Sequence, residues 1–459
     1  MFTKILIANR GEIAVRIIRA CKEMGIATVA VYSEADRNAL HVNLADESYC
    51  IGPAMLKDSY LNMTALIDVA VGCGCQAVHP GYGMLSENPK FAKLCEECHL
   101  KFIGPDWRII EKMGNKDEAR RTMRAAGVPI VPGVDSIESI DQAMKAAEKI
   151  GYPVIVKAAS GGGGKGIRIV HRPEDLPGAV KTAQAEAISS FGNGALYMEK
   201  FLTQVKHVEM QVLADEQGGI ITLGERDCSL QRKNQKLIEE SPCVTMPESV
   251  RKKMRDVTVK AVKAVGYTNA GTIEYLLDSK NNFYFMEMNT RLQVEHSVTE
   301  YVSNIDIVKW QIRIAAGIPL IYKQTDVRLH GCAIECRINS EDYKNNFRPS
   351  CGKVTLLHIP GGPWVRFDTA IYQDYTIPPY YDSLLGKLVV CARDRNEAIR
   401  KMQAALCELI IEGVNTNAEL AEALITDEKF VSGKYYTDTI EKEMKAMKSG
   451  GGLSAGDET

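Results

Sequence analysis

The sequence has 459 residues, a length that suggests roughly three domains at about 150 residues each. Lys and Arg (56) balance Asp and Glu (58) for a formal charge of -2, which excludes the overall basic field of a nucleic-acid or anionic-membrane binder. The first apolar stretch, Ile5 to Ala8, is too short for a signal peptide or a membrane span. Thirteen cysteines without a secretory signal favour reduced thiols, so we expect a cytoplasmic protein with no nucleic acid and no membrane among its partners.

The N-terminal residues alternate between strand and helix signals. Lys4 to Ala8 and Thr28 to Tyr32 are strand-like, and Glu12 to Met24 between them carries apolar residues on one helical face. A further cycle follows between Leu66 and Val78, so this order predicts a parallel sheet covered by helices over residues 1–113. The first turn lacks the G-x-G-x-x-G pattern, which disfavours a nicotinamide or flavin site.

The central part of the chain contains a compact segment between turn-rich joints, at about residues 131–203. Its strands, helices and glycine run predict a lid that moves on the rest of the chain. We therefore expect an α/β fold, of α+β type in its central part. The expected central domain covers residues 114–328, a C-terminal mixed α/β domain covers 329–447, and a flexible Gly/Ser-rich tail covers 448–459.

A stripe of polar side chains precedes His296. If residues 286–295 form one strand, alternate residues share a face, and five polar groups line one side of it. A solvated outer face is the usual interpretation of such alternation. The mixture of acid, amide and guanidinium groups favours a polar site instead. These five residues are Glu287, Asn289, Arg291, Gln293 and Glu295.

Two glutamates of neighbouring predicted strands suggest a metal site. If Asp278 pairs with Phe283 in an antiparallel hairpin, Glu274 lies directly opposite Glu287, with Cβ atoms about 5 Å apart. Two carboxylates so close need a positive charge between them, and Mg²⁺ is commonly held by two carboxylates and nucleotide phosphates. A register slip of one residue would place the glutamates on opposite faces and remove the argument.

A glycine-rich loop from Ala159 to Gly166 joins two predicted strands. Its backbone N–H groups can wrap phosphates because no Cβ atoms shield them. The loop is not a Walker motif, since Ala159 stands where that motif needs glycine and Gly166 where it needs Ser or Thr. A flexible linker is the alternative, but Lys157 at the end of the preceding strand favours a phosphate clamp.

Five segments, in this order along residues 1 to about 446, resemble the biotin carboxylase family. That family belongs to the ATP-grasp superfamily, so the resemblance implies a Rossmann-like N-terminal domain, an ATP-grasp central domain with a mobile lid, and a C-terminal domain. The segments are Ile7 to Ala14 (IANRGEIA), His79 to Gly83 (HPGYG), the glycine loop, Glu287 to His296 (EMNTRLQVEH) and Glu335 to Asn339 (ECRIN).

The resemblance implies a ligase that phosphorylates bicarbonate with ATP and Mg²⁺ or Mn²⁺, and transfers the carboxyl group of carboxyphosphate to biotin. The implied partners are a biotin carboxyl carrier protein, carboxyltransferase subunits and a second copy of the chain in a homodimer. Acetyl-CoA carboxylase, in fatty acid synthesis, is the first candidate for the parent enzyme, with pyruvate and propionyl-CoA carboxylase as alternatives. An ATP-grasp ligase with an amine or amino acid acceptor and a non-catalytic protein on the same fold also stay open.

The resemblance further assigns roles to single residues. It gives the metal to Glu274, Glu287 and Asn289, and bicarbonate to Lys236, Arg291, Gln293 and the Val294 backbone, with Glu295 as general base. Arg337 would stabilise the negative oxygen of deprotonated biotin, which is oxyanion stabilisation by a fixed cation. ATP would be held by Lys116, Lys157, Gly163, Gly164, Glu199, Lys200, Phe201, Leu202, His207, Gln231, Asn234 and Leu276.

Arg337 lies on a predicted strand from Gly331 to Asn339, which has polar residues on one face and apolar residues and cysteines on the other. A structural ion pair between Arg337 and Glu335 is the alternative to a catalytic role. Two positions depart from the family pattern: Asn234 stands where histidine is frequent, and Ser297 replaces a common proline.

A further set of residues matches the dimer surface of the family. Three of them fall on one face of the first predicted helix, and a solvated helix face explains those three equally well. The set is Arg16, Arg19, Glu23, Trp364 and Arg366.

Overall fold

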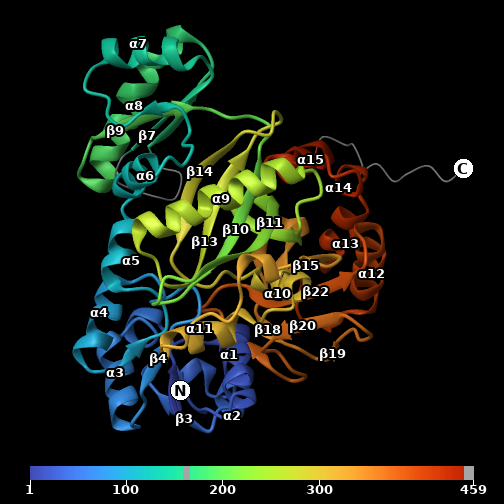
Figure 1. The fold of residues 1–459 in the computed structure, drawn as a ribbon. Coiled ribbons are helices and arrows are strands. Elements are labelled where there is room, and N and C mark those ends of the chain that lie inside the picture. Colours follow the sequence, from blue (N-terminus) through green and yellow to red (C-terminus); the bar gives the residue numbers. More distant parts are fainter. Residues whose placement is uncertain (159–165, 449–459) are drawn as a thin grey trace, which may run out of the picture.

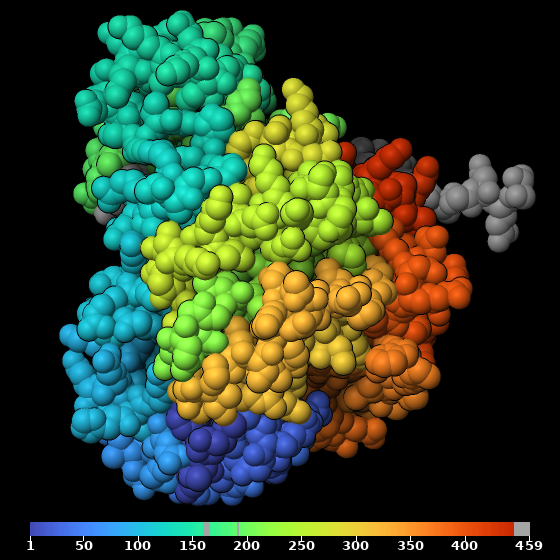
Figure 2. Space-filling view, in the orientation of Figure 1, coloured from blue at the N-terminus to red at the C-terminus, as the bar shows by residue number. Residues whose placement is uncertain are grey.

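The computed structural model describes residues 1–158 and 166–448. The N-terminal unit and the C-terminal helices lie around a large central sheet, and a smaller segment with α7 (Ile140–Ile150) and α8 (Leu176–Phe191) projects from one end of the molecule (Figure 1). The space-filling view shows the same segment standing out from the main body (Figure 2). Among the helices described, none is long and apolar enough to cross a membrane.

The N-terminal unit is a five-stranded parallel sheet in the order β3-β2-β1-β4-β5, as the alternating signals predict. Its strands are β1 (Lys4–Ile7), β2 (Ala27–Tyr32), β3 (Glu47–Cys50), β4 (Ala77–His79) and β5 (Lys101–Phe102). Its helices are α1 (Gly11–Glu23), α2 (Leu40–Leu44), α3 (Met63–Gly72), α4 (Pro89–Glu97) and α5 (Trp107–Gly114).

The projecting segment has a sheet and a core of its own. Its four strands lie in the order β6-β9-β7-β8, and its buried cluster contains only residues between Val134 and Met198. A segment that packs on itself can move as one body. The strands are β6 (Gly133–Val134), β7 (Val154–Ala158), β8 (Ile167–Val170) and β9 (Leu196–Lys200), and α6 (Lys116–Ala125) precedes them.

The central sheet has eight antiparallel strands in the order β14-β13-β10-β11-β12-β15-β22-β20. Helices α9 (Glu248–Val265), α10 (His296–Ser303) and α11 (Ile307–Ala315) pack on it. Its strands are β10 (Lys206–Ala214), β11 (Ile220–Arg232), β12 (Gln235–Ser241), β13 (Asn269–Leu277), β14 (Phe283–Asn289), β15 (Cys332–Asn339), β20 (Val365–Thr369) and β22 (Leu384–Ala392).

Pairing of β12 with β15 carries this sheet from the central part of the chain into the C-terminal part. As expected, the two faces of β15 differ: Cys332, Ile334, Cys336 and Ile338 join the apolar core beneath α12 (Arg395–Glu408), and Arg337 lies on the other face. The same sheet thus supports side chains from both parts of the chain on one surface.

The remaining elements complete the C-terminal part. The helices are α13 (Ala418–Thr426), α14 (Glu428–Val431) and α15 (Thr439–Lys448). Three two-stranded ladders pair β16 (Glu341–Asp342) with β17 (Arg348–Pro349), β18 (Gly352–Lys353) with β21 (Thr376–Ile377), and β19 (Leu356–His358) with β23 (Ile410–Glu412).

Candidate active site

A cavity of about 890 Å³ is lined by the N-terminal unit, the projecting segment, the central sheet and the C-terminal part. Most of the residues predicted to form the site line it. They are Lys157, Glu199, Lys200, Phe201, Leu202, His207, Gln231, Asn234, Lys236, Glu274, Leu276, Glu287, Asn289, Arg291, Gln293, Val294 and Arg337.

Two predicted residues within the described part of the chain do not line the cavity wall, and two others lie outside that part. Lys116 is exposed at the first turn of α6, and Glu295 is fully buried behind the wall, where it contacts Lys236 and Arg337. Gly163 and Gly164, with the rest of the glycine loop up to Lys165, lie outside the described residues.

The hairpin of β13 and β14 brings Glu274 opposite Glu287, as predicted, but the register near the turn differs from the predicted one. Pairing begins with Leu277 against Phe283, so the predicted pair of Asp278 with Phe283 is wrong by one residue. A register shift between Glu274 and Tyr275 restores the alignment of the two glutamates. A β-bulge adds one residue to one strand, which is why the carboxylates still share a face.

The polar stripe is not one strand, because β14 ends at Asn289 and Glu295 is the N-cap residue of α10. The predicted strand over residues 286–295 is therefore wrong in its second half. The side chains still converge, since Arg291 and Gln293 line the cavity from an irregular segment. A solvated face is excluded for Asn289, Gln293 and Glu295, which are buried.

Register places charged side chains in one row across four strands. Arg226 of β11 is opposite Glu209 of β10, Glu209 is opposite Glu274 of β13, and Glu274 is opposite Glu287 of β14. Directly opposite residues share a face of the sheet. Arg226 donates from Nε to Glu209 Oε1 at 2.5 Å, so the inner end of the row is already neutralised.

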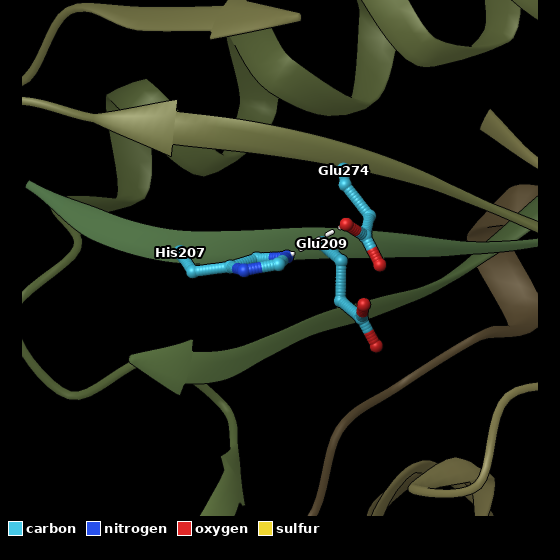
Figure 3. A group of neighbouring side chains, drawn as sticks. All are labelled: His207, Glu209 and Glu274. Carbon is cyan, nitrogen blue, oxygen red and sulfur yellow. Dashed lines mark ion pairs between the residues drawn. The ribbon is translucent and has the colours of Figure 1, made fainter. Parts of the chain in front are cut away.

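Lys236 of β12 supplies the next positive charge. Its ammonium group lies 2.7 Å from Glu209 Oε2, 3.0 Å from Glu274 Oε1 and 2.6 Å from Glu295 Oε1, which uses all three of its N–H donors. His207 Nε2 lies 3.0 Å from the other oxygen of Glu274. Figure 3 shows His207, Glu209 and Glu274 gathered on neighbouring strands. Because Lys236 already contacts both carboxylates, the cation bound by this group is the Lys236 ammonium group of the protein itself.

Glu287 differs from the glutamates that Lys236 contacts. Within residues 1–158 and 166–448 its carboxylate has no ion pair or hydrogen bond, although it lines the cavity. Partial burial and the negative charge of Glu274 raise the pKa of Glu287 above its ordinary value. A carboxylate without a partner, next to a second carboxylate, fits a divalent cation with oxygen ligands.

The Asn289 amide fits the metal less directly. Its Nδ2 donates to Glu274 Oε1 at 2.9 Å, and its Oδ1 accepts from Arg291 Nη2 at 3.2 Å. The oxygen atoms that can bind a metal from the cavity are therefore carboxylate oxygens. Asn289 would become a metal ligand only after its amide turns over.

Arg337 binds two glutamates that come from different elements. Its Nε donates to Glu239 Oε1 of β12 at 2.6 Å, and its Nη2 donates to Glu295 Oε2 at 2.8 Å. Burial raises the pKa of Glu295, but Lys236 and Arg337 lower it more, so the carboxylate is ionised. The predicted alternative, an ion pair of Arg337 with Glu335, is absent from the described residues.

Arg291 is fixed by the N-terminal unit. Its Nε donates to Glu87 Oε2 at 2.8 Å, and its Nη1 donates to Gln293 Oε1 at 3.0 Å. Sequence reasoning missed Glu87, which follows the HPGYG segment closely but carries no local signal. It also missed Glu209, which alternates with apolar residues from Val208 to Val212 and is fully buried in the structure, where its charge needs a partner.

Two of the N-terminal segments that carry the family resemblance meet at the cavity. Asn9 donates from Nδ2 to the carbonyl oxygens of Pro80 and Tyr82 at 2.7 and 2.8 Å, and the Tyr82 hydroxyl donates to Glu12. Gly81, at φ +65°, comes so close to Asn9 that a Cβ atom would lie 2.9 Å from its amide nitrogen. The IANRGEIA and HPGYG segments therefore form one wall.

The projecting segment brings a further ion pair to the cavity. Lys157 Nζ lies 2.7 Å from Glu199 Oε2, and Arg120 also binds the Glu199 carboxylate. Lys200 turns its side chain away, to the carbonyl oxygens of Gly151 and Tyr152 at 2.9 and 2.7 Å. Only the backbone of Lys200 is therefore free to face a ligand.

Asn234 lies in the two-residue turn between β11 and β12. Lys233 and Asn234 have φ of +47° and +64°, the pattern of a type I′ hairpin turn, which favours asparagine. Local backbone geometry thus suits the residue found here, and its side chain lines the cavity.

The residues that match the dimer surface behave differently from one another. Arg16 is buried and bonds Glu300 at 2.8 Å and Asp306 at 2.7 Å, so a solvated helix face is wrong for Arg16. Arg19 is exposed, and Trp364 has 65% of its surface exposed.

Comparison with known protein families gives matches to three parts of the chain. Residues 1–110 match the biotin carboxylase N-terminal domain, 115–323 the ATP-binding domain of the carbamoyl-phosphate synthase L chain, and 335–442 the biotin carboxylase C-terminal domain. Biotin carboxylase 1 of Bacillus subtilis is 54% identical over 96% of this chain and 98% of its own length. The biotin carboxylase of Haemophilus influenzae is 50% identical over 97% of this chain and 99% of its own length.

A solved structure extends the comparison to three dimensions. The dimer of the biotin carboxylase domain of Hydrogenobacter thermophilus 2-oxoglutarate carboxylase, in complex with MgADP, ADP and bicarbonate, has a TM-score of 0.90 and 49% sequence identity. The alignment covers 97% of this chain and 98% of that one. Sequence, fold and site agree, and the chain belongs to the biotin carboxylase family, as a ligase of the ATP-grasp type.

Proposed function

We propose that this chain carboxylates biotin on a biotin carboxyl carrier protein, with ATP and bicarbonate as the other substrates, through the residues named above. The observation that supports it most is the meeting of Lys236, Glu295 and Arg337 beside a row of carboxylates. In this proposal bicarbonate attacks the γ-phosphate of ATP to give carboxyphosphate and ADP. The carboxyl group then moves to a ureido nitrogen of biotin, and phosphate leaves.

ATP lies between the lid and the central sheet. The lysines Lys116 and Lys157 bind its phosphates, and Gly163 and Gly164 close over them. Since the lid has a core of its own, it can close as one body, and closure excludes water from the phosphates. Adenine lies against the backbone from Glu199 to Leu202, and the nucleotide also contacts His207, Gln231, Asn234 and Leu276.

The metal lies at the edge end of the charge row. Glu274 and Glu287 would hold Mg²⁺ or Mn²⁺, with Asn289 after its amide turns. The ion would neutralise charge on the phosphate oxygens during transfer. Lys236 is bonded to Glu274, so the metal and the ammonium group would share this carboxylate.

Bicarbonate lies between Lys236, Arg291, Gln293 and the backbone of Val294. Glu295 is ionised and within 2.6 Å of Lys236, so it can accept the bicarbonate proton as the general base. Arg337 then stabilises the ureido oxygen of biotin once the adjacent nitrogen loses its proton. The fixed ion pairs of Arg337 support this role, because a held cation needs no reorganisation during the reaction.

The domain limits proposed are 1–113, 114–328 with a lid at about 131–203, and 329–447. Arg19, Glu23, Trp364 and Arg366 form a homodimer surface with Arg16 beneath it, and the exposed Trp364 supports this surface. We place the protein in the cytoplasm, which agrees with its thirteen free cysteines, because a reducing compartment keeps thiols unpaired.

Release of ADP by the purified chain tests the proposal. We expect ATP cleavage that depends on bicarbonate and is stimulated by free biotin. Equal rates of ATP cleavage with and without bicarbonate and biotin would overturn the proposal. An amine or amino acid that stimulates ADP release in place of biotin would favour the ligase with a different acceptor.

In this proposal other subunits bind the acyl acceptor and therefore decide the parent enzyme. Acetyl-CoA carboxylase is the first candidate, and pyruvate and propionyl-CoA carboxylase are the alternatives. Purification from the source cell identifies it: we expect one biotinylated carrier to co-purify, and the carboxyltransferase bound to that carrier names the acceptor.

A further inference from the structure

Two fully buried glutamates lie directly opposite each other beside Arg337. Glu239 of β12 and Glu335 of β15 are paired in the ladder, and both have 0% exposed surface. Directly opposite residues of an antiparallel pair point to the same face, with Cβ atoms about 5 Å apart. Their carboxyl groups are therefore neighbours on the face that carries Arg337.

The hydrogen bonds of these two carboxyl groups are incomplete. Glu239 Oε1 accepts from Arg337 Nε at 2.6 Å. Among the described residues, Glu239 Oε2 and both oxygens of Glu335 have no partner, although all three are buried. A buried carboxylate that lacks both a cation and a hydrogen-bond donor is strongly unfavourable, and such a group takes up a proton instead.

The nearby cations are already committed to other groups. Arg337 binds Glu239 and Glu295, and Lys236 binds Glu295 on the other side. Lys387 of β22 lies opposite Arg337 in the ladder, but it donates to the Val294 carbonyl oxygen at 2.7 Å.

The remaining contacts of Lys387 are also with groups other than Glu335. It donates to Ser297 Oγ at 3.1 Å and lies 3.4 Å from Glu12 and 3.8 Å from Asp368. No cation of residues 1–158 or 166–448 forms an ion pair with Glu335. The third carboxylate nearby, Glu295 at the start of α10, adds only negative charge.

We propose that Glu335 is a carboxylic acid whose O–H donates to Glu239 Oε2, so that the two glutamates share one proton. This arrangement satisfies the unpartnered oxygen of Glu239 and removes the unpaired charge of Glu335. Burial raises the pKa of Glu335 well above its ordinary value, and it raises that of Glu239 to about 7 against the lowering effect of Arg337. Both directions favour a protonated carboxyl group in this pair.

A consequence for the reaction rests on the function proposed above. With the proton in place, the pair carries one negative charge, and Arg337 keeps more positive potential for the oxygen of deprotonated biotin. Loss of the proton in alkaline solution would add a second charge beside the guanidinium group. Glu335 is then a positioning residue, which acts on biotin through Arg337.

Infrared spectroscopy tests the proton without any assumption about function. A buried carboxylic acid has a C=O band separate from that of carboxylates, and the band shifts in heavy water. We expect it in the wild-type protein at neutral pH and expect its loss in Glu335→Gln. Glu300→Gln is the matched control, because Glu300 is a buried glutamate that ion pairs to Arg16 and Arg366 keep ionised. A wild-type protein without the band, or Glu335→Gln with it, would overturn the proposal.

The pH dependence of biotin carboxylation tests the effect on Arg337. The amide of Glu335→Gln can donate to Glu239 as the acid does, so activity at neutral pH should stay within about twofold of wild type. Its alkaline decline should move to higher pH, since the amide has no proton to lose. Glu335→Leu leaves Glu239 without a donor and should reduce carboxylation by about tenfold.

The outcomes separate this inference from the function on which it rests. Identical alkaline declines in wild type and Glu335→Gln would overturn the effect on Arg337. Absence of any bicarbonate-dependent and biotin-dependent ATP cleavage would overturn the proposed function, while the infrared band would still decide the shared proton.

Discussion

The two ends of the charge row across β11, β10, β13 and β14 are neutralised in different ways. At the inner end, Arg226 and Glu209 are fully buried and bonded to each other. At the edge strand, Glu287 faces the cavity and has no partner in the described part of the chain. The inner end therefore holds the sheet together, whereas the edge end leaves a charge for a ligand.

This difference indicates which charged side chains can be removed without a loss of stability. A buried ion cannot lose its partner without leaving an uncompensated charge, so its removal costs stability. A carboxylate that has no partner can be replaced by an amide without that cost, and the loss then falls on ligand binding. Substitutions along one row of the sheet should separate the two effects.

The largest effect is expected at the inner end. Arg226→Met leaves the buried Glu209 only Lys236, which Glu274 and Glu295 share, and also removes hydrogen bonds to Gln211, Thr299 and Thr272. We expect a loss of about 3–5 kcal/mol of stability, measured as the shift of the urea unfolding midpoint. Arg124→Met, which removes an exposed pair with Asp135, is the matched control and should cost less than about 1 kcal/mol. Equal shifts in the two variants would contradict the comparison.

The next effect concerns Arg337 of β15, which lies beyond the inner end of the row. Arg337→Ala should reduce carboxylation of biotin by about 10²–10³-fold, because it removes the stabilised oxyanion, and should affect bicarbonate-dependent ATP cleavage less. The two rates are measured on the same preparation. Arg395→Ala removes an arginine paired with the buried Glu240 outside the cavity and should leave their ratio unchanged. Equal loss of both rates in Arg337→Ala would argue against the oxyanion role.

Much of the fold follows from the sequence, because its parallel sheet and hairpins are built from local patterns. The cycle of strand, helix and strand at the N-terminus and the alternation of Cys332 to Asn339 were sufficient for the first sheet and for β15. The β-bulge near Met286 was not predictable, since nothing in that segment marks an extra residue. The end of β14 was not predictable for a similar reason: the sequence continues the alternation of polar and apolar residues after Asn289, although the chain there is irregular.

Contacts in the site were predictable between residues that are close in sequence. They were not predictable between residues that only the pairing of distant strands brings together. Glu274 and Glu287 are joined by a short hairpin, so their meeting follows from one pairing. Glu239 reaches Arg337 only because β12 pairs with β15, about a hundred residues later, and Glu87 reaches Arg291 across two units. Such contacts depend on strand order, which local periodicity does not encode.

A smaller effect is expected at the edge end. Glu287→Gln removes no ion pair, so its unfolding midpoint without ligand should be at least as high as that of wild type. Saturating MgATP, at about 100 times its Kd, should stabilise wild type by about 2.7 kcal/mol and the variant much less, because a metal ligand is lost. Thermal unfolding with and without MgATP measures both values. The exposed Glu216→Gln is the control and should keep the full shift. A lower midpoint of Glu287→Gln without ligand would show that its carboxylate is paired.

The smallest effect is the pH dependence of that same midpoint. Partial burial and Glu274 raise the pKa of Glu287 above its ordinary value of 4.5. Below that value both the folded and the unfolded chain hold the proton, and the residue costs nothing. As the pH rises toward neutrality the folded chain must ionise Glu287 against Glu274, so wild type should lose stability relative to Glu287→Gln. Mg²⁺ without nucleotide should reverse the loss at neutral pH in wild type only, since the ion supplies the charge that the edge strand lacks. Parallel pH curves would mean that a cation of the protein already neutralises Glu287, and the two ends of the row would then be alike.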